Sequence, residues 1–526
     1  MPNMMEEPIY PFTTRTSNLA HYICANAARL PDHHAMIWGD KSWSWSLFWE
    51  RVGRIAAILK NNGIEKGDRI LIQSTNCNQM FEAMFASFAI GAVWVPANFR
   101  GMPKDLAWMA ELSKAKLLIC HEEFPEHAAI KTPWLQSVLA IGGSSFGPNI
   151  ETLMKETAPD NNLEPVDRDD PAWLFFTSGT SGKPKAGTLT HGQLHFIINN
   201  HLCDLTPGIN HRDASLVVAP LSHGAGIHQL MISAKAAPTV LTSNKKFDTA
   251  EIWSLIEKWK ITNMFTVPTI LKLIVEAPEA QASTKDSLRY IIYAGAPMFR
   301  EDQRKAIELL GPVLVQYYGL GEVTGAITVL PPEGHAEDQL REGSCGYPRT
   351  GVQISIRDEQ GQLCADMETG EICVLGPSVF AGYWDNPEAN QKSFHDGWFR
   401  TGDIGHLDKN GYLYITGRAS DMYISGGSNI HPREIEEKIL EHEAINEVAV
   451  FGIPDAKWGE IGVAVCKYEK GKTVSAEALE AFIRQDIAGY KIPREFYFWE
   501  EIPKSGYGKL AKRLIRDELL RRKDEN

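Results

Sequence analysis

The stretch that decides the fold is Phe176-Thr-Ser-Gly-Thr-Ser-Gly-Lys-Pro-Lys-Ala-Gly187, which joins hydroxyl side chains, glycines and two lysines. The apolar run over residues 172–176 predicts a buried strand that leads into this loop. A loop of this composition can point its backbone N–H groups inward, and those donors suit phosphate oxygens. Its spacing differs from the G-x-x-x-x-G-K-S/T pattern of the common P-loop. The stretch therefore predicts a phosphate-binding loop of another kind, with a solvated turn as the alternative for the loop taken alone.

Composition places the chain among globular proteins and excludes several roles. Its 526 residues can bury several cores, so two or more domains are expected. The formal net charge of −13 disfavours nucleic acid as a partner. Eight cysteines without a C-x-x-C pair favour reduced thiols over a disulfide framework or a zinc site. Because the N-terminus does not resemble a signal peptide and no apolar run could span a bilayer, we expect a cytoplasmic protein without an integral membrane segment.

Strands and helices alternate through most of the chain, which predicts an α/β fold with mostly parallel sheets. Loop-rich segments at 142–148 and 159–171 are expected to separate two βα lobes. From residue 172 onward, short apolar strands each end in a polar or glycine-rich cluster. Since the carboxyl ends of parallel strands share one edge of a sheet, five such loops are expected to form one composite ligand site. Strands are predicted at 69–73, 92–96, 172–176, 216–219, 264–267, 290–293 and 313–316, and helices at 19–30, 77–90, 250–260 and 301–310.

A second boundary is predicted near residues 417–421. The chain beyond it has the pattern of a compact α+β unit. We therefore expect a large N-terminal domain over residues 1–418, a hinge at 419–421 and a small C-terminal domain over 422–526. In the small domain, helices are predicted at 432–442 and 476–485, and strands at 444–451, 461–468 and 496–500.

Further segments follow the phosphate loop in an order that is typical of one family. Together they resemble the adenylate-forming (AMP-binding) superfamily of acyl-CoA synthetases, luciferases and adenylation domains, and most of all its carboxylic acid–CoA ligase branch. The resemblance covers nearly the whole chain. The segments are Thr190-His191, Pro220-Leu-Ser-His-Gly-Ala-Gly226, Ala294-Gly-Ala-Pro297, Tyr318-Gly-Leu-Gly-Glu322, Trp398-Phe-Arg-Thr-Gly-Asp403, the run from Gly417-Arg418 to Glu436, and Pro503-Lys-Ser-Gly-Tyr-Gly-Lys509.

The resemblance implies an ATP site with a magnesium ion. Glu322 would supply an oxygen to Mg²⁺ beside the phosphates, and a surface carboxylate is the alternative. Asp403, expected in a tight glycine-containing turn, would accept the ribose hydroxyls, and Arg418 would contact the ribose. A structural Asp–Arg pair is the competing interpretation of these two residues. The other implied ATP-binding residues are Thr177, Ser178, Gly179, Thr180, Ser181, Gly182, Lys185, Gly295, Ala296, Pro297, Tyr318 and Gly319.

Lys509 and His223 are catalytic candidates beside Glu322. By resemblance, Lys509 reaches back into the N-terminal site and bridges the carboxylate and the phosphate during adenylation; the alternative is an ordinary solvated lysine. His223 would orient the acyl carboxylate or gate the thiol channel, although a lone histidine is more often structural. The implied acyl pocket, which would suit an aliphatic or aromatic acid, consists of His223, Gly224, Ala225, Tyr317 and Val323.

The C-terminal unit favours a thiol as the acceptor of the acyl group. Ser425, Gly426 and Gly427 resemble the CoA-binding face of CoA ligases, and the glycines would let a pantetheine arm approach closely. Trp458 would stack near the CoA nucleotide or, alternatively, pack the rim of the small domain. In the family, the mobile C-terminal domain rotates between the two half-reactions, and the resemblance places the hinge at Ser420.

Three positions depart from the family pattern. Ser420 replaces the usual Lys or Asp of the hinge, Gly321 replaces the usual Thr before Glu322, and Ala186 replaces the usual Gly after Lys185. Only the change at the hinge removes a charge, so we expect activity to survive. The departures leave rate, hinge equilibrium and substrate class open.

The sequence therefore predicts an enzyme that uses ATP and Mg²⁺ to convert a carboxylic acid into an acyl-adenylate and then transfers the acyl group to coenzyme A. The expected acid is a medium- or long-chain aliphatic acid, as in fatty acid metabolism, or an aromatic acid. The enzyme could assemble as a homodimer. The alternatives are a ligase that loads a carrier-protein phosphopantetheine, a luciferase-like oxygenase and a non-catalytic nucleotide- or acyl-binding sensor.

Overall fold

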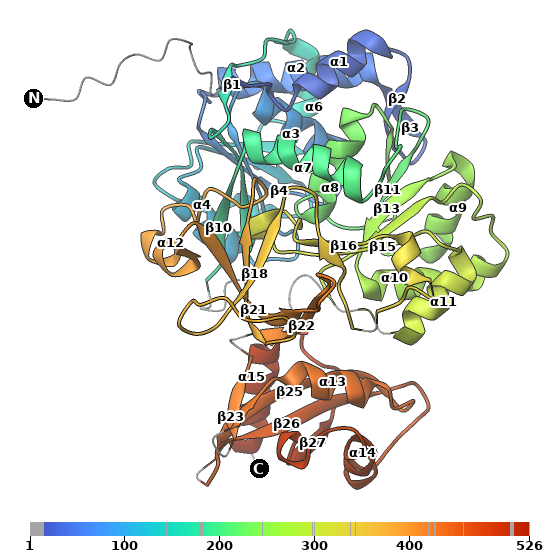
Figure 1. Ribbon diagram of the computed structural model, residues 1–526. Coiled ribbons are helices and arrows are strands. Elements are labelled where there is room, and N and C mark those ends of the chain that lie inside the picture. Colours follow the sequence, from blue (N-terminus) through green and yellow to red (C-terminus); the bar gives the residue numbers. More distant parts are fainter. Residues whose placement is uncertain are drawn as a thin grey trace, which may run out of the picture.

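The computed structural model shows an α/β protein with a large N-terminal part and a small C-terminal unit (Figure 1). This arrangement confirms the predicted fold class, while the domain limits at 418 and 422 stay a prediction. The structure describes residues 15–143, 145–177, 183–244, 246–296, 298, 300–336, 338–341, 343–418, 421–425, 428–455, 457–504 and 510–524.

The first sheet has six strands in the order β10-β9-β5-β4-β6-β7. At its centre, β4 (Arg69–Gln73) pairs in parallel with β5 (Val93–Pro96) and β6 (Leu117–His121), and these three strands are almost completely buried. Strands of this kind are continuous apolar runs, because both faces of a parallel sheet are covered. The outer strands are β7 (Ser137–Ile141), β9 (Pro171–Thr177) and β10 (Lys185–Thr190), of which β10 runs antiparallel to β9.

The second sheet has nine strands in the order β17-β16-β15-β14-β13-β11-β12-β2-β3. Its strands from β15 to β2 run parallel, so the loops after β11, β13, β14 and β15 leave from the same edge. The strands are β2 (His34–Trp38), β3 (Lys41–Ser44), β11 (Ser215–Val217), β12 (Thr239–Leu241), β13 (Asn263–Thr266), β14 (Tyr290–Tyr293), β15 (Leu314–Tyr318), β16 (Thr328–Leu330) and β17 (Tyr347–Pro348).

The two loop-rich segments do not separate two lobes, so that prediction was wrong. β9, which follows the second segment, returns to the first sheet, where Trp173 pairs with Trp94 of β5. β2 and β3, from the N-terminal part of the chain, lie instead in the second sheet beside β12. The five loops expected on one sheet therefore come from two. A strand that is buried on both faces carries no sequence signal for the sheet that it joins.

One apolar core connects the two sheets. It contains Ile70 from the first sheet and Ile292 from the second, together with most of the buried helix α3 (Asn78–Ala89). Within the described part of the chain, each helix is too short or too polar to cross a membrane. The other helices here are α1 (His21–Arg29), α2 (Trp45–Asn61), α4 (Pro103–Ser113), α5 (Pro125–Ala128), α6 (Ile150–Glu156), α7 (His191–Asp204), α8 (Gly224–Ala234), α9 (Thr249–Trp259), α10 (Pro268–Val275), α11 (Arg300–Leu310) and α12 (Pro387–Ser393), with the short elements β1 (Arg15–Thr16), β8 (Val166–Asp167), η1 (Pro278–Gln281), η2 (Gly321–Val323) and η3 (Pro332–His335).

A third sheet, which the sequence did not predict, is antiparallel and precedes the C-terminal unit. Asp403 lies within its strand β21 rather than in a tight turn, so the expected turn was wrong. Gly402, with φ of +74°, takes the left-handed backbone that glycine favours, and the strand register shifts nearby. The strands are β18 (Gln353–Arg357), β19 (Gly370–Leu375), β20 (Phe394–His395), β21 (Trp398–Leu407) and β22 (Leu413–Arg418).

The C-terminal unit has its own sheet (Figure 1). Its apolar residues form two small cores. Its central strands β25 and β26 form a long antiparallel pair, and β27 joins β26 in parallel. The elements are β23 (Tyr423–Ser425), β24 (Ser428–Ile430), α13 (Pro432–Leu440), β25 (Ile445–Asp455), β26 (Gly459–Tyr468), α14 (Ala476–Ile483), η4 (Gly489–Lys491), β27 (Glu495–Phe498) and α15 (Lys512–Asp524).

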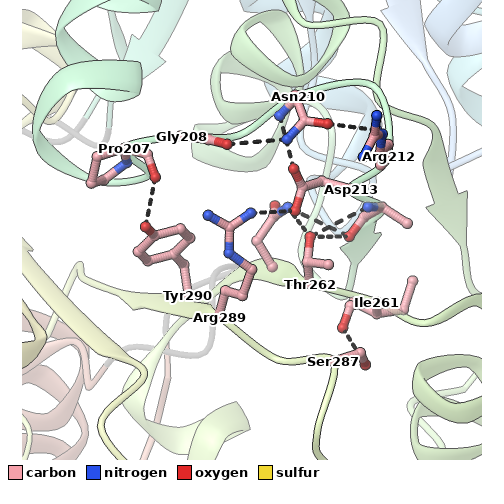
Figure 2. Close-up of polar contacts among 12 residues, drawn as sticks. Pro207, Gly208, Asn210, Arg212, Asp213, Ile261, Thr262, Ser287, Arg289 and Tyr290 are labelled. Atoms are coloured by element: carbon pink, nitrogen blue, oxygen red, sulfur yellow. Dashed lines mark hydrogen bonds and ion pairs between the residues drawn. The ribbon is translucent and has the colours of Figure 1, made fainter.

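A polar network joins the amino ends of β11, β13 and β14, opposite the edge where the ligand loops leave (Figure 2). Asp213, with only 3% of its surface exposed, accepts hydrogen bonds from Arg289 Nη1 at 2.7 Å and from the Asn210 backbone N–H at 2.8 Å. Thr262 Oγ1 donates to the Ala214 carbonyl at 3.3 Å. The network fixes how these strands start without touching the opposite edge.

Asp213→Ala is expected to lower the free energy of unfolding by about 1–3 kcal/mol, because it removes the buried acceptor of two hydrogen bonds, one of them from a charged guanidinium. Urea denaturation of the variant would measure the loss, and Asp286→Ala, at an exposed carboxylate, is the matched control. An unfolding midpoint equal to that of the parent protein would contradict the structural role of the network.

Candidate active site

The carboxylate of Glu322 joins loops from both large sheets. Glu322 lies in η2, just after β15, and only 7% of its surface is exposed. Its Oε1 accepts a hydrogen bond from Thr177 Oγ1, at the end of β9, at 3.0 Å. The same oxygen accepts a hydrogen bond from the Tyr383 hydroxyl at 2.9 Å. The surface-carboxylate alternative for Glu322 is therefore wrong, because this carboxylate is buried and held by two donors.

The arrangement around Glu322 fits a magnesium ion that is shared with phosphate oxygens. Both hydrogen bonds go to Oε1, and Oε2 accepts none from the described residues. Mg²⁺ commonly takes one or two carboxylates and completes its shell with water and substrate phosphates. Among the described residues there is no group of three His, Cys, Asp or Glu side chains that could hold a metal alone. Glu322 would therefore bind the ion together with phosphate oxygens and water, not within such a group.

Tyr383 is a residue of this site that sequence reasoning missed. Its ring lies under the ammonium of Lys185, whose Nζ is 4.9 Å from the ring centroid. Burial, together with the nearby charge of Glu322, raises the pKa of Tyr383 above its usual value, so the hydroxyl stays a neutral donor. Lys183 stacks similarly over Trp108 at 4.2 Å. The two lysines of the loop are thus held on aromatic rings where β10 begins.

Asp403 is bound from two sides. Its Oδ2 accepts a hydrogen bond from the Tyr318 hydroxyl at 2.6 Å, and its Oδ1 lies 3.0 Å from Arg418 Nε. Burial raises the pKa of Tyr318 well above its usual value, and the charge of Asp403 raises it further. The Asp–Arg pair that the sequence left open is therefore present, at the junction of β21 and β22. Contact with a ribose stays a prediction.

The turns after β14 and β15 need glycine. Gly295 has φ of +84°, in the left-handed region, and Gly295 and Ala296 are both exposed. A Cβ on Gly319 would lie 2.3 Å from the backbone carbon of Gly325, so no larger residue fits there. These turns bring exposed backbone to the edge where Tyr318 and Glu322 lie.

His223 directly precedes Gly224 of the predicted acyl pocket, and Gly224 lies close to Tyr317. His223 precedes α8, its ring meets the Phe175 ring edge-on at 5.3 Å between centroids, and its Nδ1 is 3.0 Å from Ser222 Oγ. A Cβ on Gly224 would lie 3.9 Å from the Tyr317 hydroxyl oxygen. The other two predicted pocket residues, Ala225 and Val323, are buried in the main core.

The departure at Gly321 is matched by its neighbour Phe175. A Cβ at position 321 would lie 2.7 Å from two ring carbons of Phe175 and 2.9 Å from Thr177 Cγ2. The Phe175 ring thus fills the space that a threonine side chain would need. Ala186, the second departure, is buried, and its carbonyl accepts a hydrogen bond from the Trp384 backbone N–H at 2.8 Å.

Several predicted site residues belong to the C-terminal unit or lie outside the described residues. Ser425 ends β23 opposite Gly459, and Trp458 packs against the second core of this unit with Arg494 stacked on its ring at 4.5 Å. The rim-packing alternative for Trp458 is therefore present, and its contact with CoA stays a prediction. Outside the described residues lie Ser178, Gly179, Thr180, Ser181, Gly182, Pro297, Ser420, Gly426, Gly427 and Lys509.

The sequence matches two family descriptions, "AMP-binding enzyme" over residues 24–384 and "AMP-binding enzyme C-terminal domain" over residues 434–509. The chain belongs to the AMP-binding enzymes. It is 32% identical over 503 residues to a feruloyl-CoA synthase of Amycolatopsis sp, covering 95% of this chain and 99% of that protein. It is 32% identical over 477 residues to the long-chain-fatty-acid–CoA ligase FadD13 of Mycobacterium tuberculosis, covering 88% of this chain and 91% of that protein.

A similar solved structure is the O-succinylbenzoate coenzyme A synthetase (MenE) of Bacillus subtilis in complex with ATP and a magnesium ion. It is 30% identical, has a TM-score of 0.84, and the match covers 96% of this chain and 100% of that one. The predicted family is therefore confirmed, and the chain is an enzyme of the AMP-forming acid–CoA ligase family. These three relatives carry different acids in their names, so the family leaves the acid undecided.

Gly321→Thr is expected to displace the Phe175 ring, because the new side chain would overlap it. The displacement would break the ring contact with His223, and overpacking of this kind costs about 1–3 kcal/mol. The rate of acyl-adenylate formation should fall by about tenfold, measured as pyrophosphate exchange. The double variant Gly321→Thr, Phe175→Leu restores space and should recover most of the rate. If Gly321→Thr alone were as active as the parent protein, Phe175 would not occupy the space that a threonine at position 321 needs.

Proposed function

We propose that this enzyme converts a carboxylic acid and ATP into an acyl-adenylate and pyrophosphate, and then transfers the acyl group to the thiol of coenzyme A with release of AMP. The observation that carries the proposal is the buried Glu322 carboxylate, held by Thr177 and Tyr383 where the phosphate loop begins. A carboxylate bound in this way can help to place the phosphates of ATP for in-line attack by the acid.

The nucleotide would bind between the turns of the second sheet and Asp403. Glu322 would hold Mg²⁺, which neutralises charge on the phosphates when bound. Residues 178–182 and Lys185 would contact the phosphates, and the turn at 295–297 with Tyr318 and Gly319 would border the adenine. Asp403, oriented by Tyr318 and Arg418, would accept the ribose hydroxyls. The contacts of Glu322 and Asp403 support the roles of these two residues, and the order of the family motifs supports the other roles.

The acid would bind along the start of α8. His223 would orient its carboxylate, and the acyl group would lie near Gly224, Phe265 and Tyr317, which approach one another closely. Ala225 and Val323 would close the pocket from the core side. The carboxylate oxygen attacks the α-phosphorus, forming the acyl–phosphate bond as the bond to pyrophosphate breaks. Lys509 would stabilise the charge that develops on both groups.

The second half-reaction would use another face of the C-terminal unit. We propose that rotation about Ser420 withdraws Lys509 and presents Ser425, Gly426 and Gly427, with Trp458 beside the CoA nucleotide. The thiolate sulfur then attacks the acyl carbon, and AMP leaves. The domain limits at 418 and 422 and a homodimeric assembly are part of this proposal.

A panel of short, medium, long and aromatic acids tests the proposal by AMP formation from ATP. AMP and pyrophosphate in equal amounts, with continued turnover only when coenzyme A is present, is the expected result. Pyrophosphate exchange that ignores coenzyme A would instead support transfer to a carrier protein. No consumption of ATP with any acid would contradict the proposal and leave a non-catalytic nucleotide- or acyl-binding sensor as the alternative.

Lys509→Ala is expected to slow acyl-adenylate formation by about 10²- to 10³-fold, as loss of one preorganised charge does in other enzymes. Transfer from a presynthesised acyl-adenylate to coenzyme A should change much less. The matched control is Lys504→Ala, because Lys504 pairs with Glu447 at 2.8 Å on the surface and such pairs contribute little. Equal pyrophosphate exchange by both variants would exclude Lys509 as the adenylation lysine.

A further inference from the structure

A cluster of buried polar side chains lies directly behind the predicted acyl pocket. It contains His201 from α7, His228 from α8, Tyr317 from β15 and Arg349, which follows β17, and each exposes less than a tenth of its surface. The two imidazole rings are 4.6 Å apart between centroids, and His228 Nε2 lies 3.4 Å from the Tyr317 hydroxyl. We name these four residues the pocket-end cluster.

The pocket-end cluster is continuous with the place where the acid would bind. His228 follows Gly224 by one helical turn, so both lie on the same face of α8. Phe265 contacts both: a Cβ on Gly224 would be 3.1 Å from its ring, and its ring stacks on His228 at 4.4 Å and 14°. The Phe265 ring thus lies between Gly224 and the His228 ring and connects the start of α8 to the pocket-end cluster.

Two nitrogen atoms of the pocket-end cluster have neither a hydrogen bond nor an ion pair among the described residues. Arg349 Nη2 donates to His201 Nδ1 at 3.0 Å, whereas Arg349 Nη1 and His228 Nδ1 are buried without a hydrogen-bond partner among the described residues, and Arg349 Nε has only the longer ion pair with Asp204 at 3.6 Å. A guanidinium N–H buried without an acceptor is costly, and native proteins rarely keep one without water or a ligand to satisfy it. Such donors at the end of a pocket therefore indicate an oxygen acceptor from outside the chain.

The charge of the pocket-end cluster is already balanced. Asp204 Oδ2 lies 3.6 Å from Arg349 Nε and is fixed by the Thr350 backbone N–H at 2.8 Å and by Asn200 Nδ2 at 3.1 Å. Burial lowers the pKa of His228 to about 3, and burial lowers that of His201 well below its usual value, so both imidazoles are neutral near pH 7. A second carboxylate would add an uncompensated negative charge, whereas an uncharged oxygen would not.

We propose that the acid activated by this enzyme carries an uncharged oxygen, as a hydroxyl, ether or keto group, at the end remote from its reacting carboxylate. That oxygen accepts a hydrogen bond from Arg349 Nη1 and lies beside the His228 ring. The inference rests on the proposed function and specifies its substrate class. An acid without the oxygen leaves the donors unsatisfied, and sites built for such a group reject analogues that lack it.

Matched pairs of acids test the inference in the AMP-formation assay. The pairs are 4-hydroxycinnamate with cinnamate, 4-hydroxybenzoate with benzoate, and 8-hydroxyoctanoate with octanoate, with octanedioate as the doubly charged acid. In at least one pair, kcat/KM of the oxygen-bearing acid should exceed that of its parent by about a hundredfold or more. Octanedioate should be a poor substrate.

His228→Phe tests recognition, because it keeps an aromatic ring on Phe265 while it removes both nitrogen atoms, including the one that contacts the Tyr317 hydroxyl. It should reduce the preference within the pair by about tenfold, because kcat/KM of the oxygen-bearing acid falls more than that of the parent acid. His335→Phe is the control: this buried histidine bonds Tyr293 at 3.0 Å outside the pocket-end cluster and should leave the preference unaltered.

The outcomes distinguish this inference from the proposed function. Turnover of parent acids with no preference, or with a preference unchanged by His228→Phe, overturns the inference and leaves the ligase activity standing. Octanedioate as the best substrate overturns the claim that the oxygen is uncharged. No AMP from any acid, with or without the oxygen, contradicts the proposed function and the inference together.

Discussion

The rest of the site depends on the hydrogen bonds that the buried Glu322 carboxylate accepts. Its Oε1 accepts hydrogen bonds from the hydroxyl groups of Thr177 and Tyr383. Thr177 belongs to the first sheet, Tyr383 follows strand β19 of the third sheet, and Glu322 itself follows β15 of the second sheet. The Glu322 carbonyl also accepts the Phe380 backbone N–H at 2.8 Å. One buried residue thus sets the relative position of three segments that are far apart in the sequence.

Tyr383 shows how the same contact extends to the loop lysines. The segment around Tyr383 is bound to β10, because the Thr188 backbone N–H donates to the Gly382 carbonyl at 2.9 Å. Lys185, at the start of β10, is held over the Tyr383 ring. A change at Glu322 would therefore act on Lys185 through Tyr383, without any direct contact between the two charged groups.

Asp403 connects this centre to the end of the large N-terminal part. Tyr318, at the end of β15, holds one carboxylate oxygen, and Arg418, at the end of β22, lies beside the other. Arg418 is the last described residue before the predicted hinge. A ribose bound at Asp403 would thus lie where the chain leaves the large N-terminal part. Rotation at the predicted hinge would therefore change the surroundings of the ribose.

Local signals predicted the parts of the fold that depend on local structure. Strand β14 (Tyr290–Tyr293) and strand β4 (Arg69–Gln73) match their predicted limits, because short apolar runs bounded by polar residues mark buried strands. The family motifs located Glu322 and Asp403 by order alone. Whether either residue is buried, and which side chains hold it, could not be read from those motifs.

Long-range pairing could not be predicted in the same way. The sheet that β9 joins depends on contacts with Trp94, and the antiparallel third sheet consists of strands with mixed polar and apolar residues. Tyr383 and Arg349 carry no local pattern that marks them. Their importance comes from what packs against them, namely Glu322 in one case and His201 in the other.

The measurement that tests the central claim most directly is the effect of Glu322→Gln on the two half-reactions, each assayed alone. The account predicts that pyrophosphate exchange with ATP and acid falls by about 10²-fold or more and is no longer raised by added Mg²⁺. Transfer from presynthesised acyl-adenylate to coenzyme A should be nearly retained, which would show that the variant is folded. Exchange at the parent rate, with the parent dependence on Mg²⁺, would contradict the claim that Glu322 organises the adenylation site.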